Sequence, residues 1–320
     1  MVKASAVAHP IQGLVKYHGL ADERLRLPFH DSISVCTAPL TTRTTVEFGD
    51  FPGDSAAVDG TPLSGHEMHR VLAVMDEVRR RSGIPSRFRM ESRNDFPSNV
   101  GLGASASGFA ALALAGAAAA GLEATPAELS TIARRGAGSA TRAVTGGFSK
   151  WRRGLTDEES FSEQLAGPDL EMAMIVALVP AYKQTEDAHR DAVTSPFFQA
   201  RLMEVPRLLL EMELAIRERA VARIAALAER DTLLLHGITM TGRSEMLLWR
   251  PETISVMLLV QKMRSEGLPV FFSIDTGATV YVNTVPQHAS TIEARLKESG
   301  VPTLPCTVGG PARLTGDALF

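Results

Sequence analysis

The sequence predicts an α+β fold, and three observations support this class. Strand-like and helical segments are mixed along the chain without the strict alternation of a doubly wound parallel sheet. No internal repeat divides the chain. The length of 320 residues and the hydrophobic content of 45% are enough for a substantial core, and we expect two lobes.

The first part of the chain has the composition of a β-sheet. Residues 32–48 are rich in β-branched side chains and predict two strands on either side of Pro39. Turn residues fill positions 50–60, and Val58-Asp59-Gly60 predicts a hairpin tip. A further strand-like run covers residues 88–93.

A helix is predicted at residues 64–81. Ser64 is followed three residues later by Glu67, which is the pattern of a capping box, and Gly83 stands just past the helix end. The three arginines at 79–81 suit a helix C-terminus, so we expect a solvated end there rather than an anion site.

A glycine- and serine-rich loop, residues 97–108, leads directly into a helix of very small residues at 109–121. Glycine lets the backbone approach a ligand closely, and a helix start offers unpaired N–H groups that suit an oxyanion such as phosphate. The loop lacks the preceding strand of a dinucleotide fingerprint and the lysine of a Walker motif. A tightly packed alanine- and glycine-rich helix without a ligand is the structural alternative.

The second half of the chain begins with a predicted central strand in the apolar run 171–180. It follows a loop at Gly167-Pro168, where we place the boundary between an N-terminal lobe, residues 1–168, and a C-terminal lobe, residues 169–320. The other predicted elements are a helical stretch at 200–235 with Pro206 as its start or a kink, helices at 251–265 and 288–299, and strands at 270–274 and 278–282.

Composition excludes several classes of protein. A net charge of −3 gives no electrostatic footprint for nucleic acid. The two cysteines, Cys36 and Cys306, cannot form a zinc site alone and are expected to be reduced thiols. The N-terminus lacks the apolar segment of a signal peptide, and the most apolar run, residues 109–122, is shorter than the roughly 20 residues of a membrane span. We therefore expect a cytoplasmic protein with no membrane partner.

Several segments together resemble one family of small-molecule kinases. The pattern Pro-x-x-x-Gly-Leu-Gly-x-Ser-x-Ser is similar to the phosphate loop of the GHMP kinases (galactose, homoserine, mevalonate and phosphomevalonate kinases). Three further segments resemble motifs of one branch of this family, the mevalonate diphosphate decarboxylases, and they occur in the same order as in that branch. These segments are Lys16-Tyr17-His18-Gly19, Arg134-Arg135-Gly136-Ala137-Gly138-Ser139-Ala140-Thr141-Arg142 and Asp275-Thr276-Gly277. The resemblance implies a GHMP-kinase fold in which mixed or antiparallel sheets are covered by helices and a cleft between two lobes holds ATP and substrate.

Three residues are the predicted catalytic groups. The carboxylate of Asp275, at a strand end beside glycine, can orient or deprotonate a substrate hydroxyl, although Asp-x-Gly is also a common turn. The resemblance implies that this hydroxyl is the tertiary 3-hydroxyl of a mevalonate derivative. It also implies that Lys16 borders the phosphoryl-transfer centre and that Arg142 binds the substrate carboxylate, for which a guanidinium fork is well suited.

Further residues are expected on the substrate side of the cleft. Tyr17 and His18 would line it, with His18 in place of the family's tryptophan, and a structural histidine is the alternative. Ser139 would lie near the substrate carboxylate. Lys183 is a candidate for the 5-phosphate or an exposed surface lysine. Arg134 and Arg135 are expected to be exposed helix charges.

The nucleotide side is predicted from the glycine-rich loop. The residues expected to contact ATP are Asn94, Pro97, Gly101, Gly103, Ser105 and Ser107. Either serine could instead cap the helix. Phosphoryl transfer implies Mg²⁺, but no motif identifies its ligands. His66 and His69 are three residues apart, whereas the zincin pattern requires four, so we expect no metal site there.

One departure from the family pattern concerns the substrate. The family motif carries a second lysine where this chain has Leu20, and losing a cation favours a less charged substrate. We therefore expect an ATP-dependent decarboxylase of mevalonate 5-phosphate that forms isopentenyl phosphate, similar to the phosphomevalonate decarboxylases. The alternatives are a diphosphate substrate, a mevalonate 3-kinase that does not decarboxylate, and an inactive metabolite-binding protein. The resemblance also favours a homodimer.

Overall fold

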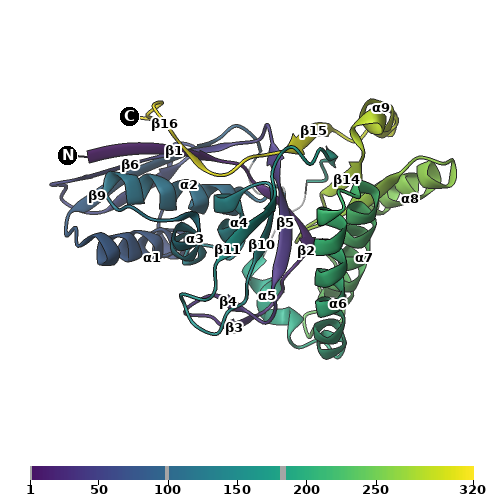
Figure 1. Ribbon diagram of the computed structural model, residues 1–320, viewed down its shortest axis with the longest axis horizontal. Coiled ribbons are helices and arrows are strands. Elements are labelled where there is room, and N and C mark those ends of the chain that lie inside the picture. The colour runs from purple at the N-terminus through teal and green to yellow at the C-terminus, as the bar shows by residue number, and fades with distance from the viewer. Residues whose placement is uncertain (1, 98–100, 181–184) are drawn as a thin grey trace.

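The computed structural model describes residues 2–97, 101–180 and 185–320, and it confirms the α+β class. Figure 1 shows a sheet with helices beneath it at one end of the molecule and a second sheet with its own helices at the other end. The N- and C-terminal ends of the chain lie close together beside the first sheet (Figure 1).

The first sheet has the order β16-β1-β6-β9-β7-β8 within the described residues. Its strands are β1 (Val2–Ala8), β6 (Thr42–Gly49), β7 (Ser55–Val58), β8 (Thr61–Pro62), β9 (Arg87–Asn94) and β16 (Arg313–Thr315). Helices α1 (Gly65–Ser82), α2 (Ala104–Ala119) and α3 (Pro126–Arg134) pack together against it. Small side chains along α2 let this helix pack closely on β1 and β6, where its alanines are buried in a shared apolar core.

The second sheet has the order β11-β10-β5-β15-β12-β14-β13, and β2 also pairs with β5. Its strands are β2 (Ile11–Val15), β5 (Ser32–Ala38), β10 (Phe148–Trp151), β11 (Ser162–Ala166), β12 (Ala173–Ala177), β13 (Val270–Ser273), β14 (Val280–Thr284) and β15 (Thr303–Val308). Strands β3 (Leu20–Asp22) and β4 (Leu27–Pro28) form a separate hairpin.

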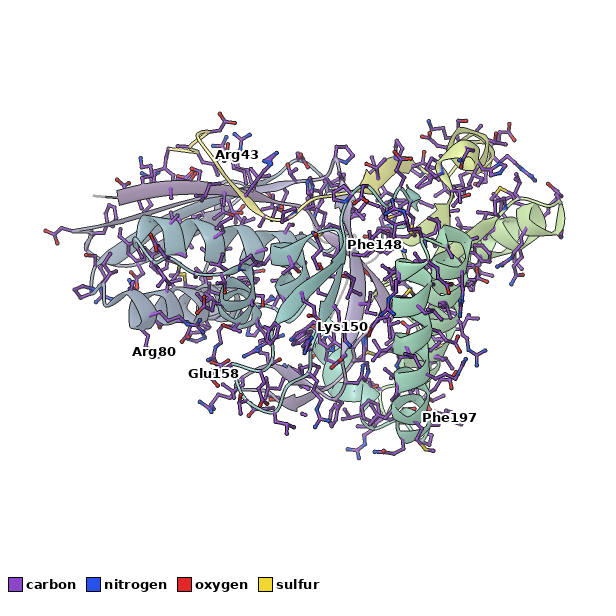
Figure 2. The ribbon with its side chains drawn as sticks, in the orientation of Figure 1. Arg43, Arg80, Phe148, Lys150, Glu158 and Phe197 are labelled. Atoms are coloured by element: carbon purple, nitrogen blue, oxygen red, sulfur yellow. The ribbon has the colours of Figure 1, made fainter. Side chains whose placement is uncertain are left out.

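Helices cover the second sheet on both faces. Helices α6 (Phe198–Arg217) and α7 (Val221–Met240) enclose one apolar core with β2, β5, β12 and β14, and α8 (Pro251–Ser265) and α9 (Ala289–Glu298) enclose another with β12, β13 and β14. Lys150, which is labelled in Figure 2, lies on β10. Its ammonium group pairs with Glu213 on α6 at 2.8 Å, which links the second sheet to this helix. The remaining elements are α4 (Ala140–Thr145), α5 (Thr185–Ala192) and a 3₁₀ turn at Pro286–His288.

Most element predictions are confirmed. Strands β5 and β6 lie on either side of Pro39, and Asp59 and Gly60 turn the β7–β8 hairpin with positive φ angles of 51° and 78°. The predicted helix at 251–265 is α8, and the apolar run 171–180 contains the buried strand β12. Pro206 lies inside α6, and a break at residues 218–220 separates α6 from α7 within the predicted helical stretch.

Two predictions about α1 are wrong. Ser64 is the N-cap residue but its side chain makes no capping hydrogen bond, so the capping box with Glu67 is not formed. The arginines at its end are paired rather than merely solvated: Arg79 binds Asp54, while Arg80 and Arg81 both bind Glu77. A carboxylate from a distant loop and one from the preceding helical turn pair with these arginines, while the Arg80 side chain stays mostly exposed.

The proposed lobe boundary at residue 168 lies in the connection between β11 and β12. The second sheet continues across it, because β5 pairs with β15 through Ala38 and Thr307. The chain then returns to the first sheet, where β16 pairs with β1. The division into two lobes remains a prediction. Strand pairs β5–β15 and β1–β16 each join a strand before residue 168 to one after it.

The segment between β15 and β16 passes close to Gly146, and this close approach leads to a stability prediction. Gly146 has φ 66° and ψ −179°, and a Cβ there would lie 2.2 Å from the backbone nitrogen of Pro311. We expect Gly146→Ala to lower the free energy of unfolding by at least about 3 kcal/mol, since strain and overlap both contribute. Gly121 has the same φ of 66° but open space around it, so Gly121→Ala should cost only about 1 kcal/mol. Equal losses in denaturant titrations would contradict this account.

Candidate active site

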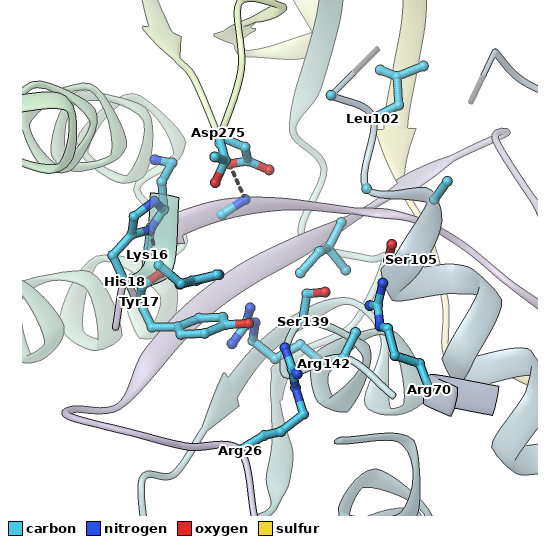
Figure 3. A pocket seen from close by; sticks show the side chains of 18 of the residues that line it. Lys16, Tyr17, His18, Arg26, Arg70, Leu102, Ser105, Ser139, Arg142 and Asp275 are labelled. Atoms are coloured by element: carbon cyan, nitrogen blue, oxygen red, sulfur yellow. Dashed lines mark hydrogen bonds between the residues drawn. The ribbon is translucent and has the colours of Figure 1, made fainter. Parts of the chain in front are cut away.

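A cavity of about 510 Å³ brings together segments from both halves of the chain (Figure 3). Its walls come from the end of β2 and the residues after it, the glycine-rich loop, the N-terminal ends of α1 and α4, and the connection after β13. Of the predicted site residues, Lys16, Tyr17, His18, Gly101, Gly103, Ser105, Ser139, Arg142 and Asp275 line this cavity.

The glycine-rich loop has the geometry expected of an anion cradle. Gly101 and Gly103 have φ angles of 88° and 76°, which side chains rarely adopt. A Cβ on Gly103 would lie 3.0 Å from the carbonyl oxygen of Ile11, so only glycine allows the loop to pass this close to β2. Helix α2 starts directly after Gly103 and directs its first N–H groups toward this region.

The two serines of α2 differ in position. Ser105 lines the cavity, whereas Ser107 is fully buried and shares a hydrogen bond of 2.6 Å with Thr42. Residues two apart on a helix point about 200° apart, so the two hydroxyls cannot face the same ligand. The structure therefore corrects the expectation for Ser107 and leaves Ser105 in place.

Two other expected contacts, Asn94 and Pro97, do not line the cavity. Asn94 binds Asp59 through its side-chain nitrogen at 2.9 Å and accepts a hydrogen bond from Thr42 at 2.6 Å. Pro97 is exposed at the end of a described segment. Lys183 lies outside the described residues.

Asp275 follows β13 and points into the cavity (Figure 3). The backbone N–H of Gly13 donates to its Oδ1 at 3.0 Å, and Nε2 of His236 donates to its carbonyl oxygen at 3.0 Å. Burial lowers the pKa of His236 to about 4, so this imidazole is a neutral donor. Backbone and side chain of Asp275 are thus both fixed.

Lys16 is buried beside Asp275. Its Nζ donates to Ser273 at 3.0 Å and to Thr232 at 3.1 Å, and lies 3.5 Å from the carboxylate of Asp231. Both Lys16 and Asp275 pack on Gly13, where a Cβ would lie 2.6 Å from Cγ of Lys16. Burial lowers the pKa of Lys16, and the negative charges of Asp231 and Asp275 oppose this shift.

Asp231 and Arg201 support Lys16, and neither was predicted from the sequence. Asp231 is fully buried on α7 and accepts from the backbone N–H of Lys16 at 3.0 Å and from Arg201 at 2.9 Å. Arg201 on α6 also donates to the carbonyl oxygen of Lys16 at 2.7 Å. An aspartate and an arginine within long helices carry no local signal for this role, because their partner is more than 180 residues away in sequence.

Arg142 lies on α4 with only 3% of its surface exposed. Its Nε donates to Ser34 at 3.0 Å and another of its nitrogens donates to Ser32. Its guanidinium lies 5.6 Å from the ring centre of Tyr17 and 5.5 Å from that of Trp151. Among the described residues it forms no ion pair with a carboxylate, and burial lowers its pKa to about 10. A buried cation held by hydroxyls and rings suits an anionic ligand.

Three rings and a hydroxyl form one wall. Tyr17 stacks on His189 with ring centres 4.8 Å apart, and His18 lies 4.6 Å from His189. Burial and the neighbouring His189 lower the pKa of His18 well below its usual value, so His18 is neutral at pH 7. Ser139 lines the cavity at the N-terminal end of α4 (Figure 3).

Four arginines differ from the sequence expectations. Arg26 and Arg70 line the cavity and were not predicted. Arg70 is positioned by a hydrogen bond of 2.8 Å to Gly136 and by the ring of Phe109. The expectation that Arg134 and Arg135 are exposed is wrong. Arg134 is fully buried and binds Asp157 and the backbone of Leu25, and Arg135 is only 16% exposed and also binds Asp157.

No group of three or more His, Cys, Asp or Glu side chains in the described parts of the chain could hold a metal ion. In those same parts, every helix is too short or too polar to span a membrane.

Comparisons with known proteins place this geometry in context. The family described as "Diphosphomevalonate decarboxylase-like N-terminal domain" matches residues 8–162. The phosphomevalonate decarboxylase of Haloferax volcanii is 48% identical over 100% of both chains. Mevalonate diphosphate decarboxylase from Staphylococcus aureus has a TM-score of 0.93 at 30% identity and covers 98% of each chain. A complex of MDDEF with MVAPP, AMPPCP and magnesium has a TM-score of 0.92 at 31% identity, covering 98% of this chain and 99% of that one.

The Lys16–Asp231 pair generates a pH prediction. Lys16 loses its charge as the pH rises through its pKa, and Asp231 raises that pKa. Asp231→Asn should therefore move the alkaline limb of the kcat profile to lower pH by at least about one unit. The other charged groups facing Lys16, Asp275 and Arg201, are unchanged in this variant.

Thr232→Val is the matched control, because it removes a neutral partner of Lys16 from the adjacent position on α7. Its alkaline limb should stay within about half a unit of that of the original protein. A folded Asp231→Asn enzyme with an unmoved limb would show that Asp231 does not set the charge state of Lys16.

Proposed function

The chain belongs to the diphosphomevalonate decarboxylase family, and from this premise we propose that it converts mevalonate 5-phosphate to isopentenyl phosphate in an ATP-dependent decarboxylation. The reaction consumes ATP and releases ADP, free phosphate and CO₂, and it serves isoprenoid biosynthesis. The observation that carries the proposal is the convergence of Asp275, Lys16 and Arg142 with the glycine-rich loop on one cavity.

The glycine-rich loop is proposed to bind the phosphates of ATP. Gly101 and Gly103 let the backbone approach the phosphates, and the N-terminus of α2 and Ser105 offer donors. Arg70 faces the loop from α1 and adds a positive charge (Figure 3). Because the described residues offer no preformed metal cage, Mg²⁺ would be held mainly by phosphate oxygens and water.

The chemistry is assigned to three side chains. Asp275 orients the 3-hydroxyl and accepts its proton as the oxygen attacks the γ-phosphorus and the bond to ADP breaks. Lys16 stabilises the negative charge on the transferring group. The new phosphate then leaves C3 with its bonding electrons, and the electrons of the C1–C2 bond form the alkene as CO₂ departs. Arg142 holds the carboxylate in place for this last step.

Two features support a monophosphate substrate. Leu20, which stands where the family pattern has a second lysine, is apolar and half-buried in β3. Asp187 lines the cavity from α5, and its carboxylate disfavours additional negative charge nearby. The 48% identical relative also carries the name phosphomevalonate decarboxylase.

A homodimer and a cytoplasmic location are further parts of the proposal. Met203, Leu210 and Leu214 on α6 are exposed by 83%, 70% and 39%. Their spacing of seven and four residues places them on one face of the helix, and an apolar stripe of this kind supports a contact between copies.

Removal of the Asp275 charge tests the catalytic assignment. Asp275→Asn should lower kcat by about 10³-fold or more, because the amide cannot accept the hydroxyl proton. The Kd for ATP should change less than about threefold, since the loop and α2 are untouched. Stopped-flow turnover and equilibrium nucleotide binding measure the two quantities. Turnover within tenfold of the original would refute the role of Asp275.

The substrate is tested by comparing mevalonate 5-phosphate with mevalonate 5-diphosphate at matched concentrations. We expect kcat/KM for the monophosphate to be at least about 100-fold higher, the scale of one missing charge partner. Release of CO₂, ADP and free phosphate in equal amounts identifies the decarboxylase. ADP without CO₂ would instead identify a kinase, and a preference for the diphosphate would overturn the argument from Leu20.

A further inference from the structure

Arg26 reaches the cavity from the loop that joins β3 to β4. Its guanidinium is directed toward Tyr17, Ser139 and Arg142 (Figure 3). Arg26 has a φ of 54°, a left-handed conformation that costs a non-glycine residue roughly 1–2 kcal/mol. Such a conformation persists where the surrounding structure enforces it, and it is found preferentially at functional sites.

The contact that enforces this conformation comes from a buried side chain. Nε of Arg134 donates to the carbonyl oxygen of Leu25 at 3.0 Å, directly before Arg26. Arg134 is fully buried and is itself fixed by Asp157 and the carbonyl oxygen of Ser160. Within the hairpin, Asp22 accepts from the N–H of Leu25 at 2.7 Å. The loop is thus held from two sides, and it presents Arg26 to the cavity.

The positive charges on this wall of the cavity indicate which kind of ligand Arg26 binds. Arg142 and Arg26 both line the cavity wall that contains Tyr17, and two guanidinium groups on one wall favour anionic ligands. The proposed substrate has two anionic ends, a carboxylate and a phosphate, on either side of C3. Arg142 is assigned to the carboxylate, which leaves the phosphate for a second cation.

The position of Leu20 in the β3–β4 hairpin supports Arg26 as the cation that binds the phosphate. Leu20 pairs with Pro28, so the apolar residue in place of a lysine lies across the hairpin from the strand that follows Arg26. We propose that Arg26 binds the 5-phosphate of the substrate and determines selectivity for a phosphorylated mevalonate, an inference that rests on the proposed function. Arg134 is then a positioning residue for Arg26.

Arg26→Gly is the informative variant. It removes the guanidinium and also relieves the left-handed backbone, so its thermal midpoint should equal or exceed that of the original protein. Calorimetric titration with mevalonate 5-phosphate should give a Kd about 10- to 100-fold weaker, the range for a lost charge-assisted hydrogen bond. Titration with unphosphorylated mevalonate should change less than about threefold. Arg26→Lys should recover part of the loss.

Arg24→Ala provides the control, because Arg24 lies in the same turn but is exposed and outside the cavity lining. It should bind both ligands as the original protein does. If Arg26→Gly weakens both ligands equally, or neither, the assignment of Arg26 is overturned. The binding measurements do not require turnover. A protein that binds mevalonate 5-phosphate but releases no CO₂ would therefore contradict the proposed function, while the test of Arg26 would still give an answer.

Discussion

The carboxylate of Asp231 is the contact on which the site depends. It is fully buried, and it binds both the backbone and the ammonium group of Lys16 as well as the guanidinium of Arg201. Helices α6 and α7 are thereby tied to the point where β2 ends and the cavity begins. Removing one partner from such a buried pair typically costs about 3–5 kcal/mol, because the remaining charge is left uncompensated. The same group therefore holds the layers together and opposes the lowering of the Lys16 pKa by burial.

Hydroxyl groups and rings carry out the remaining positioning. Arg142 is held by Ser32 and Ser34 and by the faces of Tyr17 and Trp151. None of these partners neutralises its charge, so the full attraction remains available for a substrate anion. Fixed donors of this kind need little reorganisation when charge moves during a reaction, which is the main source of electrostatic stabilisation in enzymes.

Short-range signals were sufficient to predict most elements. The hairpin tip at Asp59 and the helix at 251–265 depend on neighbouring residues, and the structure has them where expected. Helix α2, in contrast, begins at Ala104 rather than at the predicted residue 109. The family resemblance allowed the prediction that Asp275 and Arg142, more than 130 residues apart in sequence, line one cavity. Contacts between distant segments had no such signal. Arg134 was expected to be exposed because a charged helix residue usually is, and its partners, Leu25 and Asp157, come from loops with no distinguishing pattern.

The pairing of β16 with β1 links the two ends of the described chain in one sheet. During synthesis on the ribosome, β1 emerges about 300 residues before β16. Until then, β1 presents an unpaired edge that could recruit strands from other nascent chains. Completion of the first sheet is therefore a late event in biogenesis, and loss of β16 by proteolysis would expose that edge again without touching the cavity.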